Sequence, residues 1–336
     1  MSRRTPAPHR PSSTLLGLVL PLVLLGAATA LVLSWRADLP DRIATHFSSG
    51  GADGFGSWQA FLVGMVATFG AMCAGLWALA FWTGRDGSTR RIAVGTSVGL
   101  AWLCASMVVG VAWLHRGLTD PADVGDIDPV ITVGVVGGLL LGALVAWAVP
   151  GDRHQPADPA APIEGARLDL APGERAVWTR RVGSRAAVLA GGGSTVLVLG
   201  LAVGLQMPWM VAVAVLLGAT MAALIVFVVT VDARGMQVRS VAGWPRFAVP
   251  VDEVVRVRTI EVRPVRDFGG WGYRVGIEGR VGVISRGGPA IEVERAGGRR
   301  FVVTVDDAAT GAALLTTLAD RARGDGAARR EQTASR

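Results

Sequence analysis

A histidine and several carboxylates lie close together in the polar, glycine-rich segment from Ala37 to Trp58. His46 and Asp53 are seven residues apart, and Asp38 and Asp41 precede them. Imidazole and carboxylate groups at this spacing could hold a divalent cation. A structural alternative is an amphipathic turn on the neighbouring helix ends, in which His46 hydrogen-bonds within the loop. A third is a rigid epitope for a peptide, a lipid headgroup, a wall precursor or a partner protein.

The rest of the sequence offers no arrangement of residues that is typical of catalysis. No nucleophile with a base, no acid pair and no cluster of metal ligands occurs at a suitable spacing, so we predict no enzyme, no metal and no cofactor. The GGWG sequence at residues 269–272 lacks the strand, helix start and lysine of a nucleotide-binding loop. Cys73 and Cys104 lie within separate apolar runs and are expected to be free thiols.

Long apolar runs position the polar segment. The chain is 51% hydrophobic and 18% charged, and its apolar residues come in blocks too long for a soluble core. We therefore predict a polytopic α-helical membrane protein with about six transmembrane helices, each near the roughly 20 residues that cross a bilayer. The six predicted runs are 15–33, 58–82, 92–115, 129–149, 186–205 and 209–231.

Several details within these runs refine the prediction. Pro21 is expected to kink the first helix. That run could instead be a cleavable signal peptide ending near Ala30, but the apolar residues 31–33 continue it, so we expect an uncleaved helix. Glycines of the fourth run indicate close helix packing. None of the six runs contains an ionisable residue near its centre, which disfavours an ion-coupled carrier.

The distribution of arginine predicts the orientation. Residues 1–14, 84–91 and 151–185 contain three, three and six arginines, whereas the alternate loops contain Arg36, Arg42 and Arg116 in total. The excess of positive charge marks the cytoplasmic side. We therefore predict a multi-pass protein of the cell (inner) membrane with both termini in the cytoplasm and the His46 segment outside.

The pattern changes to period-two alternation after about residue 230, which is typical of strands. Strands are expected at 166–182, 231–238, 255–258, 273–277, 281–285, 290–295 and 299–305. Asp306 and Asp307 then precede an apolar-periodic helix that extends to Ala322. The prediction is a cytoplasmic, mostly β domain that ends in one helix.

Seven residues of the outer segment match a family motif that runs LP, then I, then HF, then G and D. The seven are Leu39, Pro40, Ile43, His46, Phe47, Gly51 and Asp53. The segment resembles the signature of the membrane family called domain of unknown function 1648 (DUF1648). The resemblance covers the first two helices and their loop. It implies a relation to Sdp-type proteins, which give bacteria immunity to a secreted peptide toxin and relay its presence to a regulator. These residues are the candidate ligand or partner loop.

A second resemblance covers Leu168 to Arg323. The sequences GERAVWTRR, DFGGWGYR and RGGPAIEVERAGGRRFVVTVDD make this region similar to bacterial pleckstrin-homology-like (PH-like) domains of actinobacterial membrane proteins. The resemblance implies a scaffold for lipid, peptide or subunit contact, with the fifth and sixth helices inserted after its first strand. Trp271 is expected to fill the barrel or to rest on the membrane surface. The candidate contact residues are Asp267, Phe268, Gly270, Trp271 and Tyr273.

These expectations give a domain plan and a hypothesis. The plan is a basic arm (1–14), a four-helix membrane module (15–150) with its outer loop (36–57), a linker (151–165), a PH-like domain with two inserted helices (166–323) and a disordered tail (324–336). The leading hypothesis is a non-enzymatic sensor or toxin-immunity-like protein of the cell envelope. The alternatives are an assembly scaffold that acts through the PH-like domain and a small-molecule or lipid transporter.

The expected partners follow from this plan. They are the lipid bilayer, an envelope peptide or protein outside, and a cytoplasmic protein or a second copy of the chain through the PH-like domain. We expect no nucleic acid, because the basic residues do not form a stripe interleaved with aromatic residues.

Overall fold

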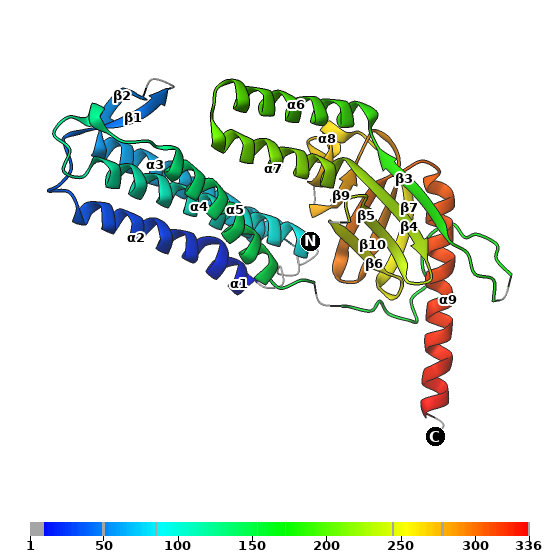
Figure 1. Ribbon diagram of the computed structural model, residues 1–336. Coiled ribbons are helices and arrows are strands. Elements are labelled where there is room, and N and C mark those ends of the chain that lie inside the picture. Colours follow the sequence, from blue (N-terminus) through cyan, green and yellow to red (C-terminus); the bar gives the residue numbers. More distant parts are fainter. Residues whose placement is uncertain are drawn as a thin grey trace. The chain divides into compact units, whose positions relative to one another are not determined.

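The computed structural model describes residues 10–48, 51–84, 86–152, 154–171, 173–243, 245–276 and 279–334 (Figure 1). The side chains of residues 185, 186, 208, 209 and 325–334 lie outside this description. The chain divides into two compact units. Unit 1 comprises Met1–Asp152 and Val198–Val213, and unit 2 comprises Arg153–Leu197 and Ala214–Arg336.

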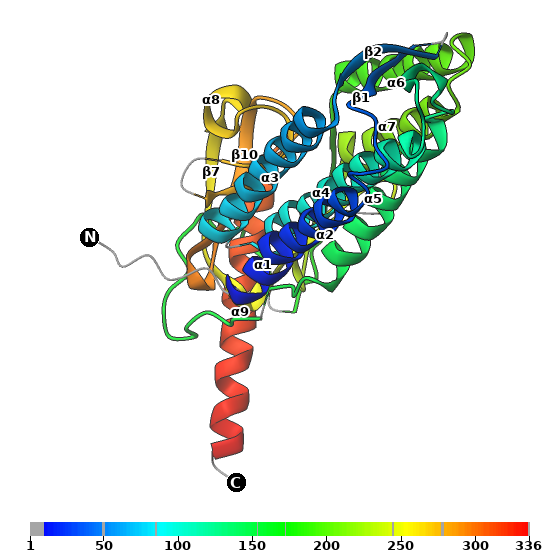
Figure 2. The ribbon, with the colours of Figure 1, turned by 90° about the vertical axis from the view of Figure 1, so that its left-hand side faces the viewer.

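Unit 1 is built from four long apolar helical stretches that run alongside one another in both views (Figure 1, Figure 2). Its helices are α1 (Arg10–Thr14), the π-helical turn η1 (Leu15–Val19), α2 (Leu20–Ser34), α3 (Trp58–Thr83), α4 (Gly87–His115), the short η2 (Pro121–Asp123) and α5 (Asp128–Ala148). The first stretch is continuous from Arg10 to Ser34. It therefore begins five residues before the predicted start at residue 15. Residues 1–9 of the predicted arm lie outside the described residues.

A π-helical turn directly precedes Pro21, the residue at which we expected a kink. Proline has no N–H to donate to the carbonyl of Gly17, four residues back. The Ser97 hydroxyl, from α4, donates to that carbonyl over 2.8 Å instead. The irregular turn is thus held by a neighbouring helix, as the apolar setting of these residues requires.

Helices α4 and α5 approach each other at their backbones. A methyl group on Gly95 would lie 2.6 Å from the carbonyl oxygen of Gly142, and one on Gly99 would lie 2.8 Å from that of Gly138. Small residues permit this close approach of helices. Cys73 and Cys104 are buried in the core of unit 1 as free thiols, as predicted.

The described residues of unit 2 form two β-sheets and several helices, and residues 198–213, where two of these helices join, are assigned to unit 1. The four-stranded sheet has the order β3-β4-β5-β6, and the five-stranded sheet has the order β7-β10-β11-β9-β8, with β11 and β9 parallel. The strands are β3 (Trp178–Gly183), β4 (Val226–Asp232), β5 (Gly235–Ser240), β6 (Arg246–Pro250), β7 (Val254–Val262), β8 (Gly272–Val275), β9 (Val281–Ile284), β10 (Gly288–Arg295) and β11 (Arg299–Thr304). The short turns are η3 (Val251–Glu253) and η5 (Ala296–Gly298), and the helices are α6 (Arg185–Gly204), α7 (Pro208–Ile225), α8 (Pro264–Phe268) and α9 (Ala308–Ala334).

One hydrophobic core joins both sheets and α9. Its members include Phe227 from the first sheet, Ile291 and Phe301 from the second, and Leu315 from the helix. The prediction of a C-terminal β-rich region that ends in a helix is therefore confirmed. Within it, α6 and α7 lie between β3 and β4, which pair with each other along their whole length.

The structure corrects the sixth apolar run. Five helices in the described part of the chain are long and apolar enough to cross a membrane, and α7 ends at Ile225, six residues before the predicted end of the sixth run. The rest of the predicted run, Val226–Val231, is strand. Valine and threonine are β-branched and favour extended backbone, and these residues alternate between buried and half-buried positions where β4 pairs with β3 and β5.

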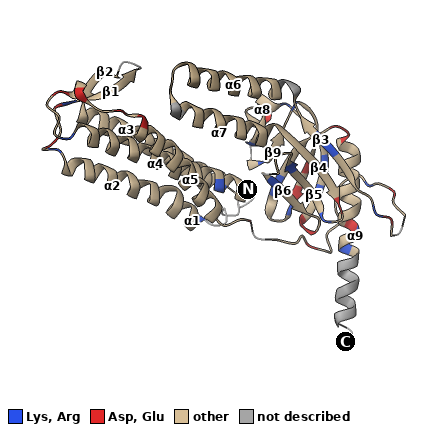
Figure 3. Cartoon of the chain, viewed as in Figure 1, with Lys and Arg blue, Asp and Glu red and all other residues tan. Residues whose placement is uncertain are grey.

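Three other boundaries also differ from the prediction. The tail expected to be disordered from residue 324 continues α9 to Ala334, because its Ala, Arg, Glu and Gln residues favour helix. Of the segment predicted as strand from Ala166 to Val182, only the part from Trp178 onward is strand. The predicted linker lies against unit 2, where Ile163 is 2% exposed. Figure 3 shows few charges along the helices of unit 1 and many on the β-rich region.

Candidate functional site

The segment from Ala37 to Trp58 contains a two-stranded antiparallel hairpin, β1 (Arg42–Ser48) and β2 (Gly51–Ser57). The segment is thus a hairpin and not the short turn that we expected, although His46 hydrogen-bonds within it and Ile43 is buried, as that interpretation predicts. A bulge near Thr45 interrupts the pairing, and Gly54 leaves room for the Cβ of His46, which a methyl group on Gly54 would approach to 2.8 Å. Ser57 then caps the start of α3 through its hydroxyl, which accepts from the N–H of Ala60.

A buried histidine fixes this hairpin to the end of α4. The backbone N–H of Ala44 donates to Nε2 of His115 over 2.9 Å, and both residues are fully buried. Because Nε2 accepts, the ring proton is on Nδ1, which donates to the carbonyl of Val111 over 2.8 Å. His115 therefore holds β1 in place at the end of α4.

His46 and Asp53 meet across the hairpin. Nδ1 of His46 lies 2.5 Å from Oδ1 of Asp53, and both side chains are largely exposed. The hydrogen bond from His46, with a second from Ser48, lowers the pKa of the Asp53 carboxyl below its usual range. The pair therefore presents a carboxylate and an imidazole to solvent with no arginine beside them among the described contacts.

A polar pocket of about 790 Å³ lies beside the base of the hairpin. Leu39 and Pro40 of the candidate loop line it together with Trp113 and Arg116. The guanidinium of Arg116 donates to the Asp38 carboxylate over 2.9 Å. It also lies 4.8 Å from the centre of the Trp35 ring and 5.3 Å from that of Trp113. This pocket combines a stacked cation, a carboxylate and aromatic surface.

The other candidate loop residues have mainly structural places. Ile43 is buried beneath the hairpin and Phe47 is half-buried. Gly51 has a φ of 104°, a conformation that glycine adopts without strain. The hairpin tip at residues 49 and 50 lies outside the described residues.

In unit 2 the candidate residues 267–273 do not converge on one pocket. Asp267 accepts from the N–H of Arg263 at the start of α8, and Phe268 is buried. Gly270 has a φ of 138°, and Tyr273 stacks on Phe247 with ring centres 4.9 Å apart. Trp271 is 56% exposed. The expectation that it fills the barrel is therefore wrong, because Phe268 occupies the interior at this turn.

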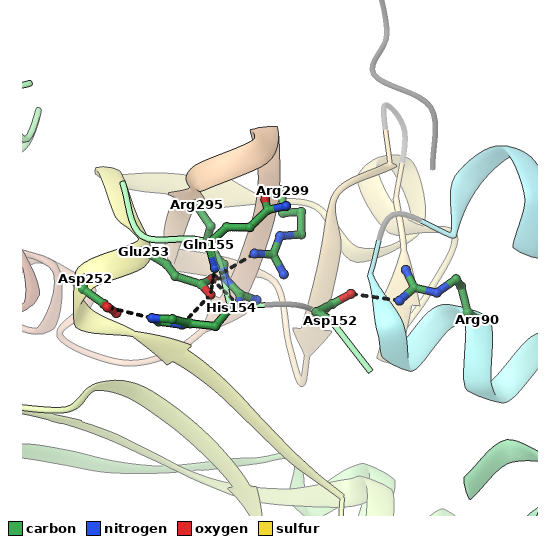
Figure 4. A network of polar contacts seen from close by, with 8 residues as sticks. All are labelled: Arg90, Asp152, His154, Gln155, Asp252, Glu253, Arg295 and Arg299. Carbon is green, nitrogen blue, oxygen red and sulfur yellow. Dashed lines mark hydrogen bonds and ion pairs between the residues drawn. The ribbon is translucent and has the colours of Figure 1, made fainter. Parts of the chain in front are cut away.

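The structure adds a buried polar network that the sequence did not reveal (Figure 4). Oε2 of Glu253 accepts from Nε and Nη2 of Arg295 at 2.9 and 2.6 Å and from Nη2 of Arg299 at 3.0 Å. Oε1 accepts from the N–H of Gln155 at 3.0 Å. His154 lies between two carboxylates, 2.8 Å from Asp252 and 3.0 Å from Glu253.

The pKa of Glu253 reflects two opposing effects. Burial of the carboxylate alone would raise the pKa, but the N–H of Gln155 and the guanidinium of Arg295 outweigh burial and lower it. No sequence spacing pointed to this network, because its members come from the linker, from η3, and from the ends of β10 and β11. Through Glu253 and Asp252, the network fixes the linker to the sheet.

No metal site is evident in the part of the chain that the structure describes, where no group of three or more His, Cys, Asp or Glu residues converges. His46 and Asp53 alone supply two ligands, fewer than a stable divalent site uses. Comparison with known proteins gives no further guidance, since no protein-family model, no curated protein and no solved structure matches this chain. Both family resemblances therefore stay predictions.

Proposed function

We propose that this chain is a multi-pass protein of the cell membrane that acts as a non-enzymatic sensor or toxin-immunity protein. In this proposal both termini are cytoplasmic and the β1–β2 hairpin receives a ligand of the envelope. Five helices that are long and apolar enough to cross a membrane support the placement. The excess of arginine in alternate loops supports the orientation.

The hydrogen bond between Ala44 and His115 carries the proposal. It is a single buried polar contact that joins the hairpin to the rigid end of α4. A buried amide that loses its acceptor costs about 1–3 kcal/mol. A ligand that moved β1 would therefore have to break this hydrogen bond or move the end of α4 as well.

The opposite end of α4 is also held by a buried polar group. Arg90 is fully buried, and its guanidinium donates to the carbonyl of Gly84 at 2.8 Å and to Asp152 at 3.1 Å. The carbonyl of Pro150 accepts from the same side chain at 3.4 Å. These groups follow the C-terminal ends of α3 and α5, where a cation is favourable. Helix α4 thus links the hairpin to the point where the chain leaves unit 1.

The exposed surface of the hairpin is suited to ligand contact. The His46–Asp53 pair is largely exposed, with Ser48 as a further hydrogen-bond donor to Asp53, and the adjacent pocket offers Arg116 with the ring of Trp113. Polar groups and aromatic surface together are typical of peptide recognition.

A resistance assay tests the proposal. A strain without the gene, complemented with the wild-type chain, is challenged with secreted antimicrobial peptides and compared with the His46→Ala/Asp53→Ala double variant. We expect the wild type to raise the inhibitory concentration of one peptide by about tenfold, equivalent to about 1.4 kcal/mol of binding free energy. The double variant should lose this protection.

Asp41→Ala is the matched control, because Asp41 is an exposed carboxylate of the same loop. His115→Phe tests the link to α4, since it keeps the volume and removes the acceptor for Ala44. We expect it to abolish protection with normal membrane levels. Equal sensitivity of deleted and complemented strains to every peptide and to envelope stress would refute the sensory proposal.

A second candidate function is an assembly scaffold that acts through unit 2. It is favoured by the exposure of two large apolar side chains near α8, since Val265 is 65% exposed and Trp271 is 56% exposed. Exposed apolar side chains mark a protein contact where they form one contiguous patch, which is the arrangement this candidate requires. Trp271→Ala should remove a complex from a native gel of solubilised membranes, whereas Val241→Ala, at another exposed apolar position, should not. Unchanged complexes in Trp271→Ala would exclude this candidate.

A further inference from the structure

Helices α4 and α5 enclose an open groove of about 370 Å³ on one side of their glycine contact. The groove is lined by apolar side chains and by glycines 95, 99, 134, 138 and 142, which contribute no side chain. The glycines therefore bring the two helices together and also leave the groove empty of protein atoms. A second apolar groove, of about 450 Å³ beside Val133, has no charged residue in its lining.

The first groove has a cation at one end. Arg91 lines it and is exposed, and its Nε donates to the carbonyl of Val149 over 2.9 Å. Within the described contacts, its terminal nitrogens have no carboxylate partner. The Val149 bond fixes the side chain at the mouth of the groove and leaves its positive charge for an anion.

The length of the groove along α4 is close to the thickness of one bilayer leaflet. It extends along α4 from Arg91 to Leu103, which at about 1.5 Å per residue corresponds to about 18 Å. The hydrocarbon core of a bilayer is about 30 Å thick, so this is slightly more than half. Trp147, which is 79% exposed at the end of α5, lies at the Arg91 end of this helix pair, where interfacial tryptophans are expected.

We propose that the α4–α5 groove binds one acyl chain of an anionic glycerophospholipid of the inner leaflet, with the lipid phosphate on Arg91. Charge complementarity selects this occupant, because a basic residue at the cytoplasmic end of a cleft between membrane helices suits an anionic headgroup. The groove beside Val133 lacks such a residue, and we assign it no ligand. This inference rests on the proposed membrane placement and is independent of the proposed sensory role.

Native mass spectrometry of the full chain in mild detergent tests this inference. Phosphatidylglycerol and phosphatidylcholine with identical acyl chains are added in equal amounts. We expect the wild type to retain phosphatidylglycerol about fivefold more, the size expected for one arginine near an anionic headgroup. Arg91→Gln should reduce that retention to the level of phosphatidylcholine. Ala143→Phe, which fills the groove from an exposed position, should reduce the retention of both lipids.

Two controls complete the experiment. Val133→Phe fills the uncharged groove on the same helix, and Arg36→Gln removes one charge at the other end of unit 1. Both should bind lipid as the wild type does. Equal retention of the two lipids by the wild type would overturn the inference, and so would undiminished retention by Arg91→Gln, which should fold even if Ala143→Phe does not. If the wild type is a dimer and Ala143→Phe is a monomer, the groove is occupied by a second copy of the chain and not by lipid. Release of the chain by alkaline carbonate would refute the membrane placement separately.

Discussion

Two groupings of histidine with carboxylate occur among the described residues, and their surroundings differ. In unit 1, His46 and Asp53 are exposed and hold only each other and nearby hairpin groups. In unit 2, His154 contacts Asp252 and Glu253, and the latter is 2% exposed and held by two arginines. The same chemistry therefore has different consequences. Contact with the buried Glu253 fixes the His154 segment to a sheet, although the His154 side chain is itself 55% exposed. The His46–Asp53 pair has no buried member, so it contributes little to folding and is accessible to a ligand.

Substitution of Glu253 should have the largest effect on stability. Glu253→Gln removes the counterion of Arg295 and Arg299, and loss of one partner from a buried ion pair costs about 3–5 kcal/mol. We expect amide hydrogen exchange in β7 and β10 to accelerate accordingly. Glu261→Gln, at an exposed position of β7, is the control. Exchange as slow as in the wild type would contradict the structural role of the network.

Acid should weaken unit 2 through the same group. The pKa of Glu253 in the folded chain is lowered from its ordinary value of 4.5. Its ionised carboxylate therefore stabilises the fold above that value, and the contribution is lost as the pH falls through the folded pKa. The thermal midpoint of the wild type should lie above that of Glu253→Gln at about pH 7. The two midpoints should converge as the pH is lowered to about 3. A constant difference across the range would show that the charge is not responsible.

His154→Ala should have a smaller effect, of about 1 kcal/mol, the usual net value of a hydrogen bond. Gln155 and both arginines still hold Glu253 in this variant. We expect faster exchange in the linker near Ala157, whose N–H donates to the carbonyl of Asp252. A loss as large as that of Glu253→Gln would mean that His154 organises the network.

The smallest effect on stability is expected for the exposed pair. Asp53→Asn and His46→Ala should leave the thermal midpoint of the chain unchanged within error, because exposed ion pairs often contribute nothing measurable. The same variants should lose any ligand of the hairpin. A clearly lower thermal midpoint would mean that the His46–Asp53 pair stabilises the fold, as the Glu253 network does.

Hydropathy predicted the long apolar helices, because an apolar run of about 20 residues has few stable structures other than a helix. It failed at Val226–Val231, where a strand core and a membrane helix have the same composition and only pairing with β3 and β5 decides between them. The hairpin was also missed. Its glycines and aspartate are poor strand formers, and the contact that fixes it comes from His115, 71 residues from Ala44.

The candidate sites show the same limit. Spacing in the sequence placed His46 near Asp53, since both lie in one short loop. It could not place Trp35 beside Arg116, because Trp35 follows α2 whereas Arg116 follows α4. The Glu253 network could not be predicted from the sequence either, because its members are far apart in the chain. Gln155 is separated from Glu253 by 98 positions, and Arg295 is separated from it by 42.

The insertion of α6 and α7 between β3 and β4 has a consequence for biogenesis. Strand β3 leaves the ribosome before both helices, yet its only pairing partner in the four-stranded sheet, β4, follows them. The sheet cannot close until the helical hairpin has been made and its ends have come together. Assembly of the β-rich unit is thus timed by the delivery of two apolar helices, and a chain that stalls there exposes an unpaired strand edge.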